Sequence, residues 1–325
     1  MMTLSKIARE AHVSVSTASK AFSGSPEVNE ETRQLVFRVA KEHGCFKKFY
    51  NVKYPKLVIG VIAPEFSSMY YTRFLSLIQQ NLDHCELCVS TTNFSPERER
   101  ELMDYYSKHS NVDGLILIDP ISRPVVSIEI PLVLLWGSKA TGGDPPGECT
   151  SIYTNGREVM REAIRYLKEK GVSSVGFISE NQTAHKEALF CRLMEEEGLP
   201  VEEKYLCCSQ KRFEEGGFQA METLLSRGVP PRAVLCAYDY VAIGAIRSLK
   251  DHGFRVPEDV AVLGKDDLAE DRYLDPPLAS ISSSPEERCR LAAEAILKRI
   301  GGEEAEKEIV VPAKLQIRRS FEIDT

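Results

Sequence analysis

Apolar residues recur with helical spacing at the start of the chain. The residues at i, i+3, i+4 and i+7 are Leu4, Ile7, Ala8 and Ala11. They would share one face of a helix, and Thr3 directly before them is of a type that caps helix N-termini. The pattern therefore predicts a short helix that ends in a turn at His12.

A second helix is predicted after Ser14, which is its candidate cap. Two small apolar residues, Ala18 and Ala21, would face inward. The residues that would face outward are Val15, Ser16, Ser19 and Lys20. Small, polar and basic side chains on the exposed side of a short helix suit entry into the major groove of DNA.

A third helix is predicted after Asn29, with Glu30 and Glu31 in the first turn, where the helix dipole favours anions. Its apolar stripe would consist of Leu35, Val36, Val39 and Ala40. Three helices in about 45 residues suit a helix-turn-helix unit, although they would also suit the core of a larger domain.

The charge distribution favours the DNA-binding interpretation. Residues 1–56 contain ten Lys and Arg against five Asp and Glu, a net charge of +5. Because the whole chain has a net charge of −7, the remaining residues carry a net charge of −12. A basic N-terminal segment on an acidic body is typical of a DNA-reading module joined to a domain that does not contact the duplex.

The rest of the chain alternates short apolar runs with helical segments. The predicted strands are 57–63, 86–91, 114–118, 132–136, 174–178, 233–237 and 260–263. This alternation predicts an α/β fold with parallel sheets and helices on both faces. About 270 residues exceed one comfortable doubly wound sheet, so we expect two subdomains with a ligand cleft between them.

Composition excludes several classes of protein. The chain has 325 residues, of which 43% are hydrophobic, and no apolar run approaches the roughly 18 residues of a membrane span, so we expect a cytoplasmic globular protein. The nine cysteines fit reduced thiols, and we expect no metal and no cofactor. No nucleotide-binding glycine motif or catalytic triad is evident, which argues against an enzyme.

Several segments in the same order resemble the LacI/GalR family of bacterial transcriptional regulators. They are residues 3–23, 26–33, 112–117, 256–264, 266–267 and 273–278. The resemblance implies a helix-turn-helix domain at 1–46, an atypical hinge or linker at 47–56, and a periplasmic-binding-protein-like effector and dimerisation domain at 57–325. Its subdomains would comprise about 57–150 with 280–307, and about 151–279 with 308–325.

The same resemblance implies a homodimer that reads a pseudo-palindromic operator. The positions that would read bases are Val15, Ser16 and Lys20. The positions that would contact phosphates are Thr3, Ser14, Thr17, Ser19 and Ser23. For each hydroxyl the alternative is an ordinary cap or helix-surface residue. No heptad pattern follows Phe321, so we expect a dimer rather than a coiled-coil tetramer.

Two departures from the family pattern lie in or near the expected helix-turn-helix domain. His12 stands where the family usually has Gly, and His tolerates a positive φ better than most residues do, so the turn should survive. The segment 45–56 replaces an Ala-rich hinge helix and its leucine wedge with aromatics and lysines. These aromatics could insert into a minor groove, or they could anchor a linker with a solvated basic face.

A third departure lies in the expected cleft. The family commonly presents an Arg, an Asn and an Asp to the effector, and the aligned residues are Lys186, Tyr238 and Asp266, of which only the aspartate is kept. The aromatic candidates are Tyr70, Tyr71 and Trp136. Together they predict an aromatic cleft with one ammonium and one carboxylate, suited to a sugar ring or a flat heterocycle. Alternatively, the aromatics pack the subdomain interface and no small ligand binds. Arg73 is expected to be a surface or ion-pair residue.

The leading hypothesis is a sequence-specific DNA-binding regulator, of the repressor type, whose cleft closes on a sugar or related metabolite and changes the relative orientation of the two heads of the dimer. One alternative is a DNA-binding regulator without a small effector, or with a protein corepressor. Another is a cytosolic solute-binding module or an enzyme that uses the same fold.

The altered hinge leads to a first testable prediction. Because the segment lacks the leucine that would wedge between base pairs, we expect little or no bending of bound operator DNA. A circular-permutation gel measures the bend angle, and a large bend would contradict this interpretation of the hinge.

Overall fold

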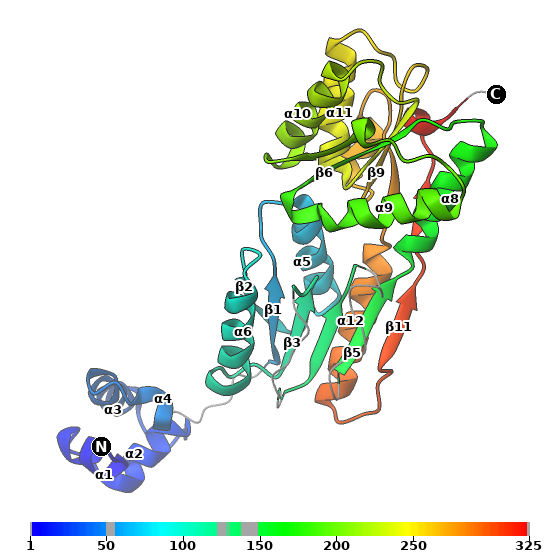
Figure 1. The fold of residues 1–325 in the computed structure, drawn as a ribbon. Coiled ribbons are helices and arrows are strands. Elements are labelled where there is room, and N and C mark those ends of the chain that lie inside the picture. The colour runs from blue at the N-terminus through cyan, green and yellow to red at the C-terminus, as the bar shows by residue number, and fades with distance from the viewer. Residues whose placement is uncertain (1, 50–55, 122–127, 129, 138–148, 324–325) are drawn as a thin grey trace. The chain divides into compact units, whose positions relative to one another are not determined.

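A computed structural model describes residues 2–49, 56–121, 128, 130–137 and 149–323. The chain divides into two compact units, Met1–Leu57 and Val58–Thr325, which are described separately (Figure 1). We call the first unit the head and the second unit the body.

The head contains four helices in its described residues, namely α1 (Leu4–Glu10), α2 (Val15–Phe22), α3 (Glu30–Glu42) and α4 (Phe46–Phe49). The predicted caps at Ser14 and Asn29 are confirmed, because each side chain accepts a hydrogen bond from a backbone N–H three residues later, at 2.9 and 2.8 Å. Thr3 occupies the cap position of α1, but its side chain makes no capping hydrogen bond.

The turn between α1 and α2 keeps its tight geometry without a glycine. His12 adopts a φ of +52°, and the N–H of Val13 closes the turn by donating to the carbonyl of Ala8 at 2.9 Å. The expectation that histidine would tolerate this turn is therefore confirmed.

Aromatic side chains form much of the head core. Phe22 stacks on Phe37 with ring centroids 5.6 Å apart, and Phe46 meets Phe37 edge-on at 4.9 Å. The predicted stripe of α3 is wrong at Leu35, which is 38% exposed, because Phe37 takes the inward position instead. Phe49 also packs on Phe22, at 5.7 Å.

The helix α4 therefore ties the start of the expected linker to the head. For Phe46 and Phe49 the anchoring alternative holds, since both rings pack in the head core. The remaining aromatics of the predicted hinge, Tyr50 and Tyr54, lie outside the described residues.

The first sheet of the body contains six described strands, all parallel, in the order β2-β1-β3-β4-β5-β11. The strands are β1 (Val58–Ala63), β2 (Glu86–Thr91), β3 (Gly114–Ile118), β4 (Leu132–Leu135), β5 (Cys149–Thr154) and β11 (Glu308–Val311). The helices of this half are α5 (Met69–Asn81), α6 (Pro96–Asp104) with a π-turn at Tyr105–His109, and α12 (Pro285–Ile300).

The second sheet contains six described strands in the order β7-β6-β8-β9-β10-β12, and only β12 is antiparallel to its neighbour. The strands are β6 (Val175–Glu180), β7 (Leu206–Ser209), β8 (Ala233–Cys236), β9 (Ala261–Lys265), β10 (Ala279–Ser282) and β12 (Lys314–Gln316). The helices are α8 (Gly156–Glu169), α9 (His185–Glu196), α10 (Phe213–Ser226) and α11 (Asp239–Asp251). Short 3-10 turns lie at Asn181–Thr183, Glu203–Tyr205, Ala269–Tyr273 and Arg319–Phe321.

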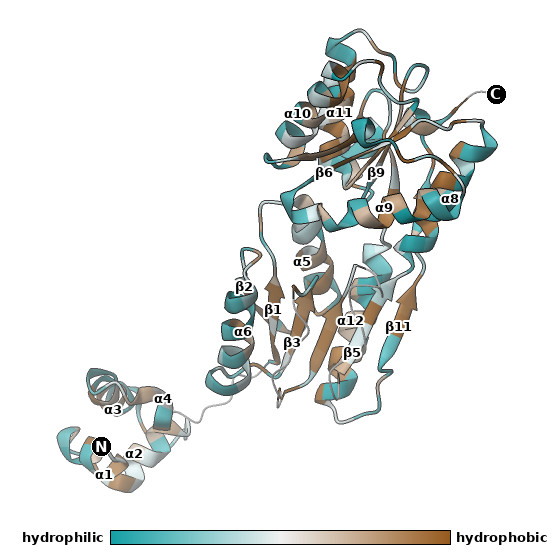
Figure 2. Ribbon diagram, viewed as in Figure 1, coloured by the Kyte–Doolittle hydropathy of each residue, from teal (hydrophilic) through white to brown (hydrophobic). Residues whose placement is uncertain are grey.

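Burial follows the predicted α/β architecture. The strands β3, β4, β5 and β8 are buried at every position. In Figure 2 the strands of the body are mainly brown, whereas α6 and α8 are brown on one side and teal on the other. Parallel strands covered on both faces by amphipathic helices produce this pattern.

The described chain crosses between the two sheets after β5, after β10 and after β11. The boundaries expected near residues 151, 280 and 308 therefore come about three residues too early, because each falls inside a strand. Ser151 pairs with Glu308 in the first sheet, and Ser280 pairs with Gln316 in the second. Each of these strands therefore lies entirely in one sheet, and the chain crosses to the other sheet only after the strand ends.

Two glycines allow α10 and α11 to pack backbone against backbone. A Cβ at Gly244 would lie 2.0 Å from the carbonyl oxygen of Glu214, and a Cβ at Gly217 would lie 2.0 Å from that of Val241. This close approach fixes the first residues of both helices beside the C-terminal end of β8.

The substitution Gly244→Ala tests this packing. The added methyl group meets rigid backbone, so we expect a loss of about 3 kcal/mol in the free energy of unfolding, measured with urea. The control is Gly301→Ala at the end of α12, where the nearest atom to a new Cβ is 3.4 Å away. Equal destabilisation by the two substitutions would contradict the account.

Candidate functional sites

The predicted DNA-reading face of α2 is exposed in the head. Ala18 and Ala21 are fully buried, whereas Val15 is 46% exposed. The other exposed candidates are Thr3, Ser14, Ser16, Ser19, Lys20 and Ser23, and Thr17 is half-buried. The inward and outward assignments made from the sequence are therefore confirmed, although burial does not test the roles of these residues in DNA binding.

Several candidate hydroxyls already have partners within the head. Ser14 Oγ accepts from the N–H of Thr17 and lies 2.8 Å from Thr17 Oγ1, while Ser23 Oγ donates to the carbonyl of Lys20 at 3.1 Å. Lys20 pairs with the carboxylate of Glu27, and both side chains are exposed. An exposed ion pair is worth at most about 1 kcal/mol, so Lys20 can exchange it for another partner.

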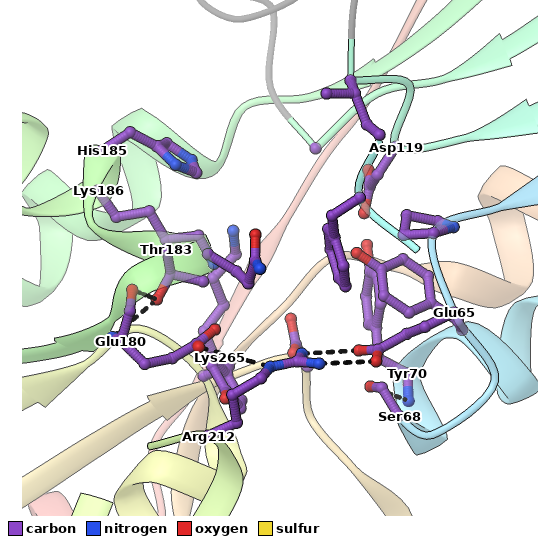
Figure 3. A pocket seen from close by; sticks show the side chains of 18 of the residues that line it. Glu65, Ser68, Tyr70, Asp119, Glu180, Thr183, His185, Lys186, Arg212 and Lys265 are labelled. Atoms are coloured by element: carbon purple, nitrogen blue, oxygen red, sulfur yellow. Dashed lines mark hydrogen bonds and ion pairs between the residues drawn. The ribbon is translucent and has the colours of Figure 1, made fainter. Parts of the chain in front are cut away.

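The body contains a cavity of about 530 Å³ between its two sheets. It lies where strands of both sheets end, which is the usual position of ligand sites in open parallel sheets. All six residues predicted for the cleft line it, namely Tyr70, Tyr71, Trp136, Lys186, Tyr238 and Asp266. Figure 3 shows side chains from the two halves facing each other across this space.

The charges of the cleft differ from the expectation of one ammonium and one carboxylate. The carboxylates among its described lining residues are Glu65, Asp119, Glu180 and Asp266, and the basic groups are His185, Lys186, Arg212 and Lys265. Asp119 directly follows β3, Glu180 ends β6 and Lys265 ends β9. Charged residues at the ends of predicted strands could have identified these three side chains as cleft residues, but the prediction from the sequence did not use this position.

A bidentate ion pair joins the two halves at the cleft. Arg212 donates from Nη1 and Nη2 to the two oxygens of Glu65, each at 2.8 Å. Its Nε lies 3.5 Å from Glu180, and its guanidinium lies over the rings of Phe94 and Phe213, at 5.1 and 4.5 Å from the ring centroids. Hydrogen bonding to Glu65 raises the pKa of Arg212, so the guanidinium stays charged over any working pH.

A second arginine also links the two halves. Arg73 pairs with Glu286 and donates to the carbonyl of Asp267 at 2.7 Å. Its predicted role as an ion-pair residue is therefore confirmed.

The buried Arg288 holds part of the aromatic wall in place. Its Nη2 donates to the carbonyl of Trp136 at 2.8 Å, and its Nη1 donates to Tyr70 Oη at 3.2 Å. The guanidinium also lies over Phe74, 4.8 Å from the ring centroid. Arg288 is fully buried and therefore acts on the cleft only through the residues it positions.

Five buried polar atoms of the lining residues make no hydrogen bond with a described residue. Three of them belong to Glu180 and Arg212, which form an ion pair with each other, and the other two belong to Trp136 and Asp119. Trp136 Nε1 and Asp119 Oδ1 are buried without a hydrogen bond. Buried polar atoms without partners are costly and occur in few places in a folded protein. One donor and one acceptor in the same cleft are well suited to the hydroxyl groups of a ligand.

Tyr238, by contrast, is satisfied internally. Its Oη accepts a hydrogen bond from the N–H of Phe213 at 3.0 Å, and the two rings meet edge-on. Phe213 has a φ of +56°, so this contact fixes an unusual backbone conformation at the start of α10. The hydroxyl group of Tyr238 therefore has the structural role that was the alternative to ligand binding, although the residue still lines the cavity.

Lys186 and Asp266 carry shifted pKa values. Burial, together with the charge of Lys265, lowers the pKa of Lys186 to about 8, and its Nζ donates to the carbonyl of Ala237 at 3.0 Å. Burial raises the pKa of Asp266 to about 7. Asp266 has a φ of +117°, a strained conformation of the kind that is concentrated at ligand sites.

Comparison with known protein families matches both units. The model described as "Bacterial regulatory proteins, lacI family" matches residues 3–45, and a periplasmic binding protein-like domain matches residues 164–321. No helix in the described part of the chain has the length and apolar character needed to cross a membrane.

Relatives cover nearly the whole chain. The sequence is 28% identical over 315 residues to a ribose operon repressor of Haemophilus influenzae, covering 92% of each chain. It is 29% identical over 340 residues to the HTH-type transcriptional repressor PurR of Escherichia coli, covering 98% of this chain and 97% of that one. Both relatives are transcriptional repressors rather than enzymes.

Solved structures agree in fold. A complex of the transcriptional regulator CelR with cellobiose is 25% identical, with a TM-score of 0.68, and covers 98% of this chain and 100% of that one. The lac repressor dimer bound to operator and the anti-inducer ONPF is 20% identical, with a TM-score of 0.68 and 99% coverage of both chains. The helix-turn-helix head and the periplasmic-binding-protein-like body predicted from the sequence are therefore confirmed.

The raised pKa of Asp266 gives a prediction for stability. The folded protein keeps a proton at Asp266 up to about pH 7, whereas the unfolded chain releases it near the ordinary value of 3.8. The folded state thus binds more protons between these values, so this group's contribution to stability falls as pH rises. In Asp266→Asn, the decline in unfolding free energy from pH 5 to 7 should be shallower by up to about 1.4 kcal/mol per pH unit.

Urea unfolding of the ligand-free protein at several pH values measures this slope. Asp83→Asn, which changes an exposed carboxylate, is the control and should keep the wild-type slope. A slope in Asp266→Asn equal to that of the wild type would contradict a raised pKa at this position.

Proposed function

Because residues 3–45 match the lacI family of bacterial regulatory proteins and repressors are similar over nearly the whole chain, we propose that this protein represses transcription as a homodimer that binds a pseudo-palindromic operator in the cytoplasm. The observation that carries the proposal is the exposed face of α2, a helix held by the Ser14 cap and the tight turn at His12. The balance of +5 over residues 1–56 suits a surface that approaches phosphates. In this proposal residues 1–46 read DNA and 57–325 bind the effector and the second subunit.

Base reading is assigned to Val15, Ser16 and Lys20. Val15 is exposed and apolar, as a contact with a thymine methyl group requires. Lys20 can leave Glu27 and donate to guanine O6 and N7. Ser16 lies on the same exposed face and can donate to or accept from a base edge.

Phosphate contacts are assigned to Thr3, Ser14, Thr17, Ser19 and Ser23. In the described head, Ser19 makes no side-chain hydrogen bond, so its hydroxyl needs no rearrangement to reach a phosphate. Ser14 and Ser23 are exposed; Ser14 Oγ makes two hydrogen bonds, both to Thr17, and Ser23 Oγ makes one, but a hydroxyl keeps further capacity. Ser14 serves as cap and phosphate contact together.

The cleft is proposed to bind a sugar or a related metabolite. Tyr70, Tyr71 and Trp136 offer faces for an apolar ring surface, and Lys186 and Asp266 offer a donor and an acceptor. The unpartnered Asp119 Oδ1 adds a further acceptor for a hydroxyl group. Relatives named for a ribose operon and for cellobiose support this class of ligand.

Regulation would follow from closure of the cleft. A ligand that contacts both halves favours one relative orientation of the two sheets, and a dimer can transmit that preference to operator affinity. The Glu65–Arg212 bridge already joins the halves without a ligand, so the effector acts on a cleft that is partly held together.

The substitution Lys20→Ala tests the reading face. We expect it to relax preference at one operator position at a cost of about 1–3 kcal/mol for the preferred base. The matched variant Ser19→Ala removes a phosphate contact and should weaken all sequences alike. Both are measured by competition among single-base variants of an operator selected by the wild-type protein. An unchanged base preference in Lys20→Ala would refute the assignment of this face.

A further inference from the structure

A second cavity of about 310 Å³ adjoins the cleft. It shares four lining residues with the cleft, namely Gly137, His185, Lys186 and Lys265. Its other walls come from α8 and α9, with Gly156, Met160, Ala188 and Leu189 among its lining residues. We call this cavity the side pocket. A ligand in the cleft could therefore extend into it past Lys186 and Lys265.

The charge of the side pocket has one sign. Its basic lining residues are Arg157, His185, Lys186, Arg192 and Lys265, and none of its described lining residues is acidic. This differs from the cleft, where four carboxylates balance the basic groups. Cavities lined by basic groups of one sign attract anions, because low-dielectric walls focus the field.

Carboxylates of the adjoining cleft offset part of this charge, because Asp266 interacts electrostatically with Lys186 and Lys265. Arg157 pairs with Glu196 at 3.0 Å, and Lys186 donates to a backbone carbonyl. His185, Arg192 and Lys265 make no side-chain hydrogen bond or ion pair with any described residue. Clustering of these cations disfavours their own charged forms, since the pKa values of both His185 and Lys186 are lowered by burial and by neighbouring lysines.

A bound anion would supply negative charge and hydrogen-bond acceptors to these basic side chains. A phosphate or carboxylate accepts several hydrogen bonds at once, and charge-assisted hydrogen bonds are roughly twice as strong as neutral ones. Arg192 offers a planar fork of donors, and Lys265 offers a flexible point charge that borders both cavities.

We propose that the side pocket binds the phosphoryl or carboxylate group of an anionic sugar whose ring lies in the aromatic cleft. The inference rests on the proposed function, because it takes the cleft as the site of the sugar ring. It narrows the effector from sugars in general to acidic sugar derivatives, and it assigns Arg192 and Lys265 to specificity for charge.

The first test uses inorganic phosphate, which needs no knowledge of the sugar. Full-length protein is melted in phosphate and in chloride at equal ionic strength, alongside the double variant Arg192→Gln/Lys265→Gln. The control is Arg247→Gln, since Arg247 lies on the exposed face of α11 and pairs only with Asp251 among the described residues. Melting in chloride reports whether each variant folds.

We expect phosphate to raise the melting temperature of the wild type and of Arg247→Gln by at least about 2 °C more than that of the double variant. The comparison between variants removes the general stabilisation that phosphate gives to any protein. An equal rise in all three proteins would overturn the proposal.

The second test compares neutral and acidic sugars by calorimetry. The probes are ribose, ribose 5-phosphate, glucose, glucose 6-phosphate and glucuronate. In the ribose series or the glucose series, an acidic sugar should bind at least tenfold more tightly than its neutral parent. In the double variant, this difference in affinity should disappear. Phosphate and carboxylate are distinguished by which glucose derivative gains more.

The outcomes separate this inference from the proposed function. Equal affinity for neutral and acidic probes, with operator binding intact, would overturn the side pocket as an anion site and leave the regulator. An absence of binding by every acidic probe would also overturn it. Failure of the wild type to bind any operator would instead refute the proposed function, whatever phosphate does.

Discussion

The body depends on the way in which three crossings of the chain are tied together. The crossing after β5 is bonded to the crossing after β11, because the N–H of Ala313 donates to Asn155 Oδ1 at 2.6 Å. The crossing after β10 is bonded to the same segment, because Ser284 Oγ donates to the carbonyl of Pro312 at 2.7 Å. The two sheets are therefore joined by one hydrogen-bonded hinge rather than by three independent linkers. Opening and closing about this hinge is the relative motion of the halves that such a connection favours.

This hinge explains why the polar and charged residues of the cleft lie together. With the hinge fixed, ends of strands from both sheets border one space. Residues that follow β1, β3 and β4 of the first sheet line the same cavity as residues at or after the ends of β6, β8 and β9 of the second sheet. The Glu65–Arg212 bridge and the hydrogen bond from Arg73 to the carbonyl of Asp267 also hold the halves together. A ligand that contacts both halves would add to the stability of an arrangement that these contacts already favour.

The sequence predicted local features well because these depend on neighbouring residues. The faces of α2, the caps at Ser14 and Asn29 and seven of the twelve described strands of the body follow from periodicity and turn chemistry. The strands β5, β7, β10, β11 and β12 were not predicted. Five of the six cleft residues came from the family resemblance and Trp136 came from its place at the end of a predicted strand, and all six line one cavity. The misses involve distant partners: Glu65 and Arg212 are 147 positions apart, and Arg288 and Tyr70 are 218 apart. Phe37 displaced Leu35 from the head core for a similar reason, since it packs on Phe46 of a helix that no pattern predicted.

The central claim is that the head reads a specific DNA sequence. The most direct measurement is selection of bound DNA from a random pool by the full-length protein, repeated at two salt concentrations because phosphate contacts make affinity depend on salt. The account predicts a palindromic motif that persists at the higher salt concentration, with two half-sites related by the symmetry of a dimer. Enrichment of no motif, or binding that disappears uniformly with salt, would contradict it.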